Sequence, residues 1–306
     1  MALLEKKFGL IIKYSGDHCI VKKIIITLIS FLFMNTCHHM IYADNSHHHA
    51  MKDLPMSSSK LENTPTMQLE VQNIIDKKDK KLVFVKLTDI KSNKPITFHD
   101  LVEIHTKKFH LLIIDNHLID YSHVHPVETA TPGIYQFEWQ PNFKNASYRA
   151  WADLLQTHTN TQEYVTVDLT SPQVVKRTKN PVPNRTVLES TVNGYQFKLT
   201  FDKMPLLAGK PAMGEINVTD AKGHPVHTLE PIMGAYAHIV GFNEDFKTVT
   251  HVHPLGKEPK NSTERGGPQL QFHIEPNKAG FIKMFAQVQI DGKVLYVPFA
   301  FTVKNA

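Results

Sequence analysis

Cysteine is almost absent from this sequence, which has 2 cysteines and 19 histidines among its 306 residues. Two thiols exclude a scaffold held by several disulfides and a zinc site of three or four thiolates. The charge is also nearly balanced, since 34 basic residues face 29 acidic ones, and so mild an excess does not indicate a nucleic-acid-binding protein. With 42% hydrophobic and 21% charged residues, the composition is that of a globular protein. The surplus of histidine is therefore the feature that needs an explanation.

A long apolar segment is also absent, because the most apolar run covers only the 11 residues of Ile24–Met34. A helix needs roughly 20 such residues to cross a bilayer. Two lysines precede the run and the small residue Ala43 follows it, which is the pattern of a secretory signal peptide. We therefore predict a signal peptide over residues 1–43 and a periplasmic or secreted protein without stable membrane insertion after cleavage. An uncleaved anchor and a lipoprotein modified at Cys37 are the alternatives.

The rest of the chain has the pattern of an all-β protein. Residues 44–66 are polar, contain three consecutive histidines and predict a flexible tail. From Met67 onward, short runs of β-branched and aromatic residues alternate with turn residues, as in Leu82–Leu87 and Phe109–Ile114. No segment shows a long helical period, so we predict strands throughout.

The two halves of this β region resemble each other. The runs 109–126 and 237–254 align without a gap, and further matches follow on the C-terminal side of each. A sheet with one apolar face must bury it against a second layer, which favours a sandwich. We therefore predict a tandem pair of homologous immunoglobulin-like β-sandwich domains over residues 67–170 and 188–306. The proline-bearing, basic residues 171–187 are the predicted linker.

Each half carries a histidine 13 residues before a His-Val-His-Pro motif. The two triads are His110, His123 and His125 in the first half, and His238, His251 and His253 in the second. If the two runs form a hairpin, its centre falls in a polar, turn-like stretch and His110 lies directly across from His123. His125 projects from the same face as His123, because residues two apart on a strand share a face. The proline ends the strand, so we expect the patch at the end of the sandwich, open to solvent.

Three converging imidazoles predict a metal site, because each can bind an ion at about 2.0–2.1 Å. The other residues on that face are apolar, and such surroundings lower the pKa of histidine and favour the neutral form that a metal requires. Histidine sites suit Cu(II) and Zn(II), and affinity alone favours copper over zinc. His105 and Met233, each five residues before the first triad histidine, are the candidate fourth ligands. The alternative is structural: the histidines bond loop carbonyls and hold the hairpin end.

The histidine pattern resembles that of a group of exported bacterial proteins whose sandwich domain carries H-x-K-x-x-H-L followed by HxHP. In this chain the matching residues of the first half are His105–Leu111 and His123–Pro126. The second half keeps the motif at His251–Pro254 but departs from the first part, with Met233 in place of the first histidine. The resemblance covers most of residues 80–155 and 212–303 and implies a heavy-metal- or copper-associated periplasmic protein.

From these observations we expect an extracytoplasmic protein that sequesters or delivers copper, or alternatively zinc, and whose partner is an envelope metal-transport or acceptor protein. A tri-histidine zinc hydrolase or hydratase is a second hypothesis. It is the weaker one, because no general base accompanies the histidines at a defined spacing and neither a G-x-S-x-G nor an H-E-x-x-H motif occurs. A metal-free interaction module of the cell envelope is the third.

Overall fold

The computed structural model describes residues 65–159, 161–169 and 185–306, with the side chain of His251 excepted. The predicted signal peptide, all but the end of the predicted tail and most of the predicted linker lie outside these residues. The described strands all belong to one compact unit, residues 59–306. Among the described residues, no helix has the length and apolar character that a membrane span requires.

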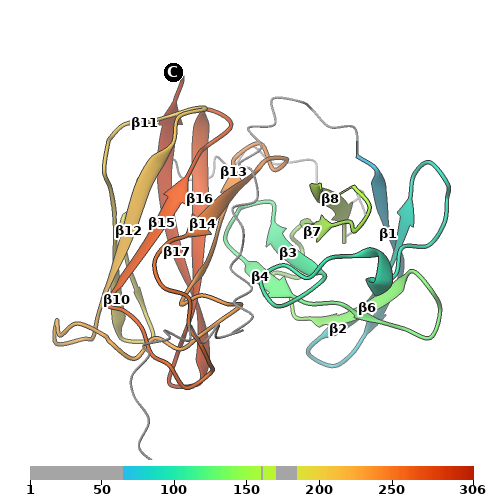
Figure 1. The fold of residues 1–306 in the computed structure, drawn as a ribbon, viewed down its shortest axis with the longest axis horizontal. Coiled ribbons are helices and arrows are strands. Elements are labelled where there is room, and N and C mark those ends of the chain that lie inside the picture. The colour runs from blue at the N-terminus through green and yellow to red at the C-terminus, as the bar shows by residue number, and fades with distance from the viewer. Residues whose placement is uncertain (1–64, 160, 170–184) are drawn as a thin grey trace, which may run out of the picture. The chain divides into compact units, whose positions relative to one another are not determined.

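The first half forms two antiparallel sheets with one hydrophobic core between them (Figure 1). Along β2, the residues Val83, Val85 and Leu87 alternate with less buried neighbours and point into this core, where they meet Leu111 and Ile113 of β3. A 3-10 helix, η1, covers Phe98–Asp100. The strands are β1 (Met67–Asp76), β2 (Lys81–Asp89), β3 (His110–Asp115), β4 (Tyr121–Val124), β5 (Val127–Glu128), β6 (Ile134–Trp139), β7 (Tyr148–Leu155) and β8 (Gln162–Asp168).

The order of these strands is that of an immunoglobulin-like sandwich. One sheet runs β1-β2-β6-β5 and the other β4-β3-β7-β8. In chain order these are the A-B-E-D sheet and the C′-C-F-G sheet of the immunoglobulin fold. The predicted all-β, immunoglobulin-like fold is therefore confirmed.

The second half has the same strand order around its own core. Its nine strands form a continuous sheet, β11-β17-β16-β13-β14-β15-β12-β10-β9, in which β14 pairs with β13 on one side and β15 on the other. The paths β10-β12-β15-β14 and β17-β16-β13-β14 match the two sheets of the first half. The strands are β9 (Glu189–Val192), β10 (Tyr195–Phe201), β11 (Leu206–Leu207), β12 (Ala212–Thr219), β13 (His238–Asn243), β14 (Val249–Pro254), β15 (Gln269–Ile274), β16 (Gly280–Ile290) and β17 (Lys293–Lys304).

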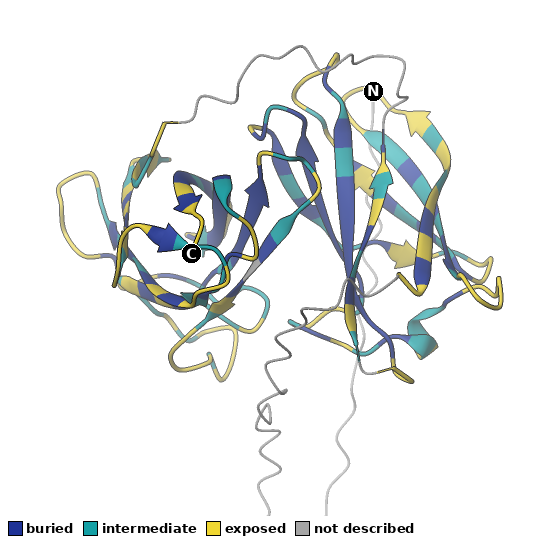
Figure 2. Cartoon of the chain, turned by 90° about the horizontal axis from the view of Figure 1, so that it is seen from above, coloured by how far each residue is buried: buried dark blue, intermediate teal, exposed yellow. Residues whose placement is uncertain are grey.

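Strand β3 is buried on both faces, although a strand at the surface of a sandwich usually buries only one. All six of its residues are buried, and buried segments run along strands of both halves (Figure 2). Its outer face belongs to a third hydrophobic cluster that joins the two sandwiches. The buried members of this cluster are Leu112, Ile114, Leu118, Tyr121 and Trp151 of the first half, and Val240, Phe242 and Phe285 of the second.

Polar contacts accompany this apolar interface. The Arg149 guanidinium lies 5.1 Å from the centre of the Phe246 ring and donates a hydrogen bond of 2.9 Å to the Phe246 carbonyl. Leu112 and Val240 occupy equivalent positions in the two aligned halves, as do Ile114 and Phe242. The contact therefore joins nearly the same patch of both sandwiches, as in an isologous interface.

Candidate metal site

The first histidine triad is carried by the hairpin of β3 and β4. In this hairpin Leu112 pairs with His123, so the predicted pairing of His110 with His123 is wrong by two residues. The turn is wider than expected because the Asp115 carboxylate accepts hydrogen bonds from the backbone amides of His117, Ile119 and Asp120. A shift of two residues leaves every side chain on its original face, whereas a shift of one would invert them. The predicted convergence of the triad is therefore kept.

Three ring nitrogens of the triad converge on one point. The distance is 3.1 Å between His110 Nδ1 and His123 Nε2, and 3.2 Å between His110 Nδ1 and His125 Nε2. His110 and His123 are buried, and His125 is half-buried. The three side chains form a group whose ligand atoms all lie within 4.8 Å of one another, which is compatible with a bound metal ion.

The outer nitrogens of the two buried rings show where their hydrogens are. His110 Nε2 donates a hydrogen bond of 2.7 Å to the Ile104 carbonyl, and His123 Nδ1 donates one of 3.0 Å to Gln287 Oε1. Because these oxygens only accept, each neutral ring has its hydrogen on the outer nitrogen. The inner nitrogens, His110 Nδ1 and His123 Nε2, then present lone pairs to each other. Facing lone pairs repel unless a proton or a metal ion lies between them.

This arrangement is the one that metal-bound histidines have in proteins. A metal-ligating imidazole usually donates its second ring hydrogen to a carbonyl or carboxylate, which sets the tautomer and orients the ring. Tetrahedral ligands at about 2.1 Å from an ion lie about 3.4 Å apart, close to the separations within the triad. The triad therefore has both the inner spacing and the outer hydrogen bonds of a histidine metal site.

Burial also favours the neutral form of two of these imidazoles, those of His123 and His125. Loss of solvent lowers the pKa of His123 well below 6.5, and the neighbouring His125 and His110 lower it further. Burial, followed by the charges of His110 and Lys107, lowers the pKa of His125 from 6.5 to about 4. A neutral imidazole is the form that a metal ion needs, so His123 and His125 do not have to lose protons near neutral pH in order to bind one.

The lowered pKa of His125 predicts that the metal-free protein loses stability in mild acid. Above pH 6.5 the imidazole is neutral in the folded and unfolded chains, so it contributes nothing. As the pH falls from 6.5 towards 4, the unfolded chain takes up a proton that the folded site does not, and the free energy of unfolding decreases. Urea unfolding in the presence of a chelator, at pH 7 and pH 5, measures this loss. In the His125→Gln variant the decrease should be smaller, and an equal decrease would contradict the assignment.

The candidate fourth ligands lie in two equivalent turns. His105 and Met233 both have a positive φ, 48° and 51°, inside turns closed by the bridges Ile104–Lys107 and Ile232–Ala235. The turns contact each other, since a Cβ atom added to Gly234 would lie 3.9 Å from Thr106 Cγ2. The His105 ring centre is 6.0 Å from that of His110. His105 therefore borders the triad, whereas Met233 lies in the matching turn of the second sandwich.

The second predicted triad is only partly described. The His238 ring lies beside the first triad, with its centre 4.6 Å from that of His123. His253 pairs with His273 across β14 and β15, with ring centres 6.4 Å apart, and burial lowers the pKa of His253. The His251 side chain lies outside the described part of the chain, so the assembly of this triad stays a prediction.

Sequence reasoning missed Gln287, the acceptor that orients His123. A signal was present in the alignment of the halves, where Gln287 in the run 282–288 corresponds to Asp153 in 148–154. Both are polar residues in apolar runs, and both are buried. In the β-sheets, Asp153 pairs with His110 and Gln287 pairs with His238. The aligned runs thus each carry one such polar residue, and the sheet pairing places it beside the first histidine of each triad.

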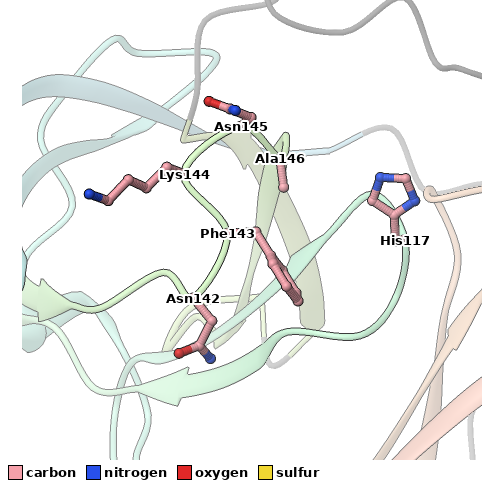
Figure 3. A pocket seen from close by; sticks show the side chains of 6 residues that line it. All are labelled: His117, Asn142, Phe143, Lys144, Asn145 and Ala146. Carbon is pink, nitrogen blue, oxygen red and sulfur yellow. The ribbon is translucent and has the colours of Figure 1, made fainter.

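A surface pocket of about 370 Å³ lies next to the hairpin turn of the first sandwich (Figure 3). None of the triad residues lines it. Its walls are His117, Asn142, Phe143, Lys144, Asn145 and Ala146. The pocket is therefore separate from the candidate metal site.

Comparison with known proteins adds one family match. Residues 190–305, which include nearly the whole second sandwich, match the family described as a domain of unknown function, DUF8832. No curated protein matches the chain. The family match therefore concerns the second half and carries no functional description.

Several solved structures are similar at a low level. FdeC, an Escherichia coli adhesin, and InvD of Yersinia pseudotuberculosis are each 12% identical to the chain, with TM-scores of 0.24. The alignments cover 78% and 79% of this chain but only 64% and 59% of those chains, so it spans less than two thirds of their length. The D00-D0 domain of intimin is also 12% identical, with a TM-score of 0.22 and coverage of 77% and 98%. Similarity at this level says nothing about function, and the fold assignment rests on the strand order described above.

Proposed function

We propose that this chain is an extracytoplasmic metal-binding protein that holds an ion at the triad of His110, His123 and His125. The observation that carries the proposal is the pair of inner nitrogens, His110 Nδ1 and His123 Nε2, which lie 3.1 Å apart on rings whose outer hydrogens are already donated to Ile104 and Gln287. A hydrogen on His125 Nε2 can satisfy His110 Nδ1, but in the neutral forms no hydrogen is left to lie between His110 Nδ1 and His123 Nε2. A metal ion at the centre satisfies all three nitrogens at once.

The donor set favours copper, with zinc as the alternative. Imidazole nitrogens suit both Cu(II) and Zn(II), and the intrinsic order of affinities places Cu(II) above Zn(II). No cysteine occurs after Cys37, so a thiolate ligand from the described sandwiches is excluded. The absence of a strong soft ligand supports the oxidised, divalent ion.

The unequal burial of the triad supports a role in sequestration or delivery. His110 and His123 are buried and oriented by hydrogen bonds, whereas His125 is half-buried. Two anchored ligands and one more accessible ligand suit an ion that is held and then handed to an acceptor protein of the envelope. Export is supported by the signal-peptide pattern at residues 1–43.

Metal binding by the full chain tests the proposal. Equilibrium dialysis against Cu(II) or Zn(II), followed by elemental analysis, should give one ion per chain at the site. The triple variant His110→Ala/His123→Ala/His125→Ala should lose this ion, because the described part of the chain holds no second group of three such ligands that converge in this way.

Two control variants separate the site from other histidines. His224→Ala removes an exposed imidazole whose Nδ1 lies 3.1 Å from the Asp220 carboxylate, and His47→Ala/His48→Ala/His49→Ala removes the histidines of the tail. Both should keep the ion. Absence of binding in the wild type would refute the proposal and leave a metal-free interaction module. Unchanged binding in the triple triad variant would assign the ion to residues outside the triad.

A further inference from the structure

We infer that the two sandwiches share the metal ion, with His238 of the second sandwich as its fourth ligand and Gln287 as the residue that positions His123. The inference rests on the proposed function, because it needs an ion at the first triad. It replaces two separate sites, one in each half, by one site at the interface.

Ring distances support His238 as a ligand. Two imidazoles bound to one ion at about 2.1 Å have their ring centres about 5 Å apart. Within the triad the separations are 5.3, 4.9 and 4.8 Å. The ring centre of His238 lies 4.6 Å from that of His123 and 6.2 Å from that of His110. The His238 ring therefore lies beside the triad. Its nitrogens are not part of the group whose ligand atoms all lie within 4.8 Å of one another, so a bound ion would draw His238 closer to complete a four-coordinate site.

Gln287 links the two halves through the same site. It lies on β16, where it pairs with His238 of β13, and its Oε1 accepts the hydrogen bond from His123 Nδ1. The side chain is buried, so water does not replace it easily as an acceptor. The second sandwich thus supplies both a ligand and the group that fixes the tautomer of a ligand in the first.

The apolar interface holds these groups in register. Leu112 lies two residues after His110, and Val240 two residues after His238, and both belong to the cluster that joins the sandwiches. The hydrophobic contact and the histidines therefore lie on the same strands. Binding of the ion should tighten this contact, and release of the ion should require that the two sandwiches loosen.

Titration of the full chain with Co(II) and Zn(II) tests the shared site. Replacement of His238 should lower the affinity at least roughly 10-fold and change the visible spectrum of bound Co(II), because water or another group replaces an imidazole. His238→Ala and the larger His238→Gln should behave alike, and their urea midpoints without metal show whether they fold. His253→Ala is the matched control, since His253 belongs to the second predicted triad but not to the shared site.

The positioning role of Gln287 predicts a change in metal affinity without a change in the Co(II) spectrum. Gln287→Leu should lower the affinity roughly 10–100-fold but leave the Co(II) spectrum unchanged, because the ligands stay the same. Gln287→Glu, which keeps an acceptor oxygen, should restore the affinity. A loss that Gln287→Glu does not restore would show a packing role and would overturn this part of the inference.

The outcomes separate the inference from the proposed function. A single ion per chain, weakened by the His238 variants and not by His253→Ala, supports the shared site. Wild-type affinity and spectrum in the His238 variants, or two independent ions per chain, would overturn the shared site while the triad still binds. Absence of any ion in the wild type would overturn both.

Discussion

The Trp151→Ala variant is expected to be less stable than the wild type by about 3–5 kcal/mol, the usual cost of removing a buried tryptophan side chain. Trp151 is 1% exposed and belongs to the cluster between the sandwiches. Its ring centre lies 5.4 Å from that of Phe242, and its Nε1 donates a hydrogen bond of 3.4 Å to the Lys247 carbonyl. The substitution leaves a cavity and removes these contacts across the interface. Urea unfolding of the metal-free protein measures the loss.

Trp151→Phe is the matched control for this experiment. Phenylalanine keeps an aromatic ring against Phe242 but not the hydrogen bond to Lys247, so the loss of stability should be clearly smaller. A loss of about 0.5 kcal/mol or less for Trp151→Ala is the size found at exposed positions. Such a result would mean that the sandwiches do not pack against each other through Trp151 in solution.

Zinc should stabilise the folded protein by about 2.7 kcal/mol when the free ion is at a hundred times its dissociation constant. The ion binds the assembled triad, and His110 and His123 come together only when β3 and β4 pair. The unfolded chain lacks this arrangement, so binding shifts the equilibrium towards the folded state. The midpoint of thermal unfolding with and without zinc shows the effect.

The stabilisation by zinc should disappear in His123→Ala and remain in His224→Ala, whose imidazole is exposed. Copper is expected to act in the same direction, at lower free concentrations than zinc. An unchanged midpoint in the wild type at saturating metal would contradict the triad as a metal site. An equal shift in His123→Ala would assign the stabilisation to other histidines.

The all-β fold was predictable because its signals are local. Alternation of buried and less buried residues along β2, and turn residues between short apolar runs, follow from the two-residue period of a strand. The convergence of the triad was predictable for the same reason. Even a register error of two residues left His110, His123 and His125 on one face, because side chains alternate between the two faces of a strand and only an odd shift moves them to the other face.

The width of the hairpin turn was not predictable from spacing. It depends on the Asp115 carboxylate, which accepts hydrogen bonds from three backbone amides of the turn. A symmetric hairpin is the simplest assumption for two matching runs, but a side chain that caps the turn adds residues to it. The resulting register is why the predicted partner of His110 was wrong.

The solvent exposure of the site depends on both sandwiches, and the local sequence of one does not determine it. We expected the triad at a solvent-exposed end, whereas the outer face of β3 is buried against the second sandwich and only His125 is half-buried. The apolar residues on that face border the histidine triad. They are in addition the surface that joins the two halves.

The residue types and the alternation of side chains along each strand were thus enough to predict the fold and the three converging imidazoles. Both signals are properties of short segments. The hydrogen-bond acceptor of His123 and the approach of His238 depend on residues 164 and 115 positions away along the chain. Such contacts form only when the apolar faces of the two sandwiches pack together. The local sequence pattern does not show which side chains this packing brings into contact. The tertiary structure alone therefore decided that a triad recognisable in one sandwich lies where a second sandwich can complete it.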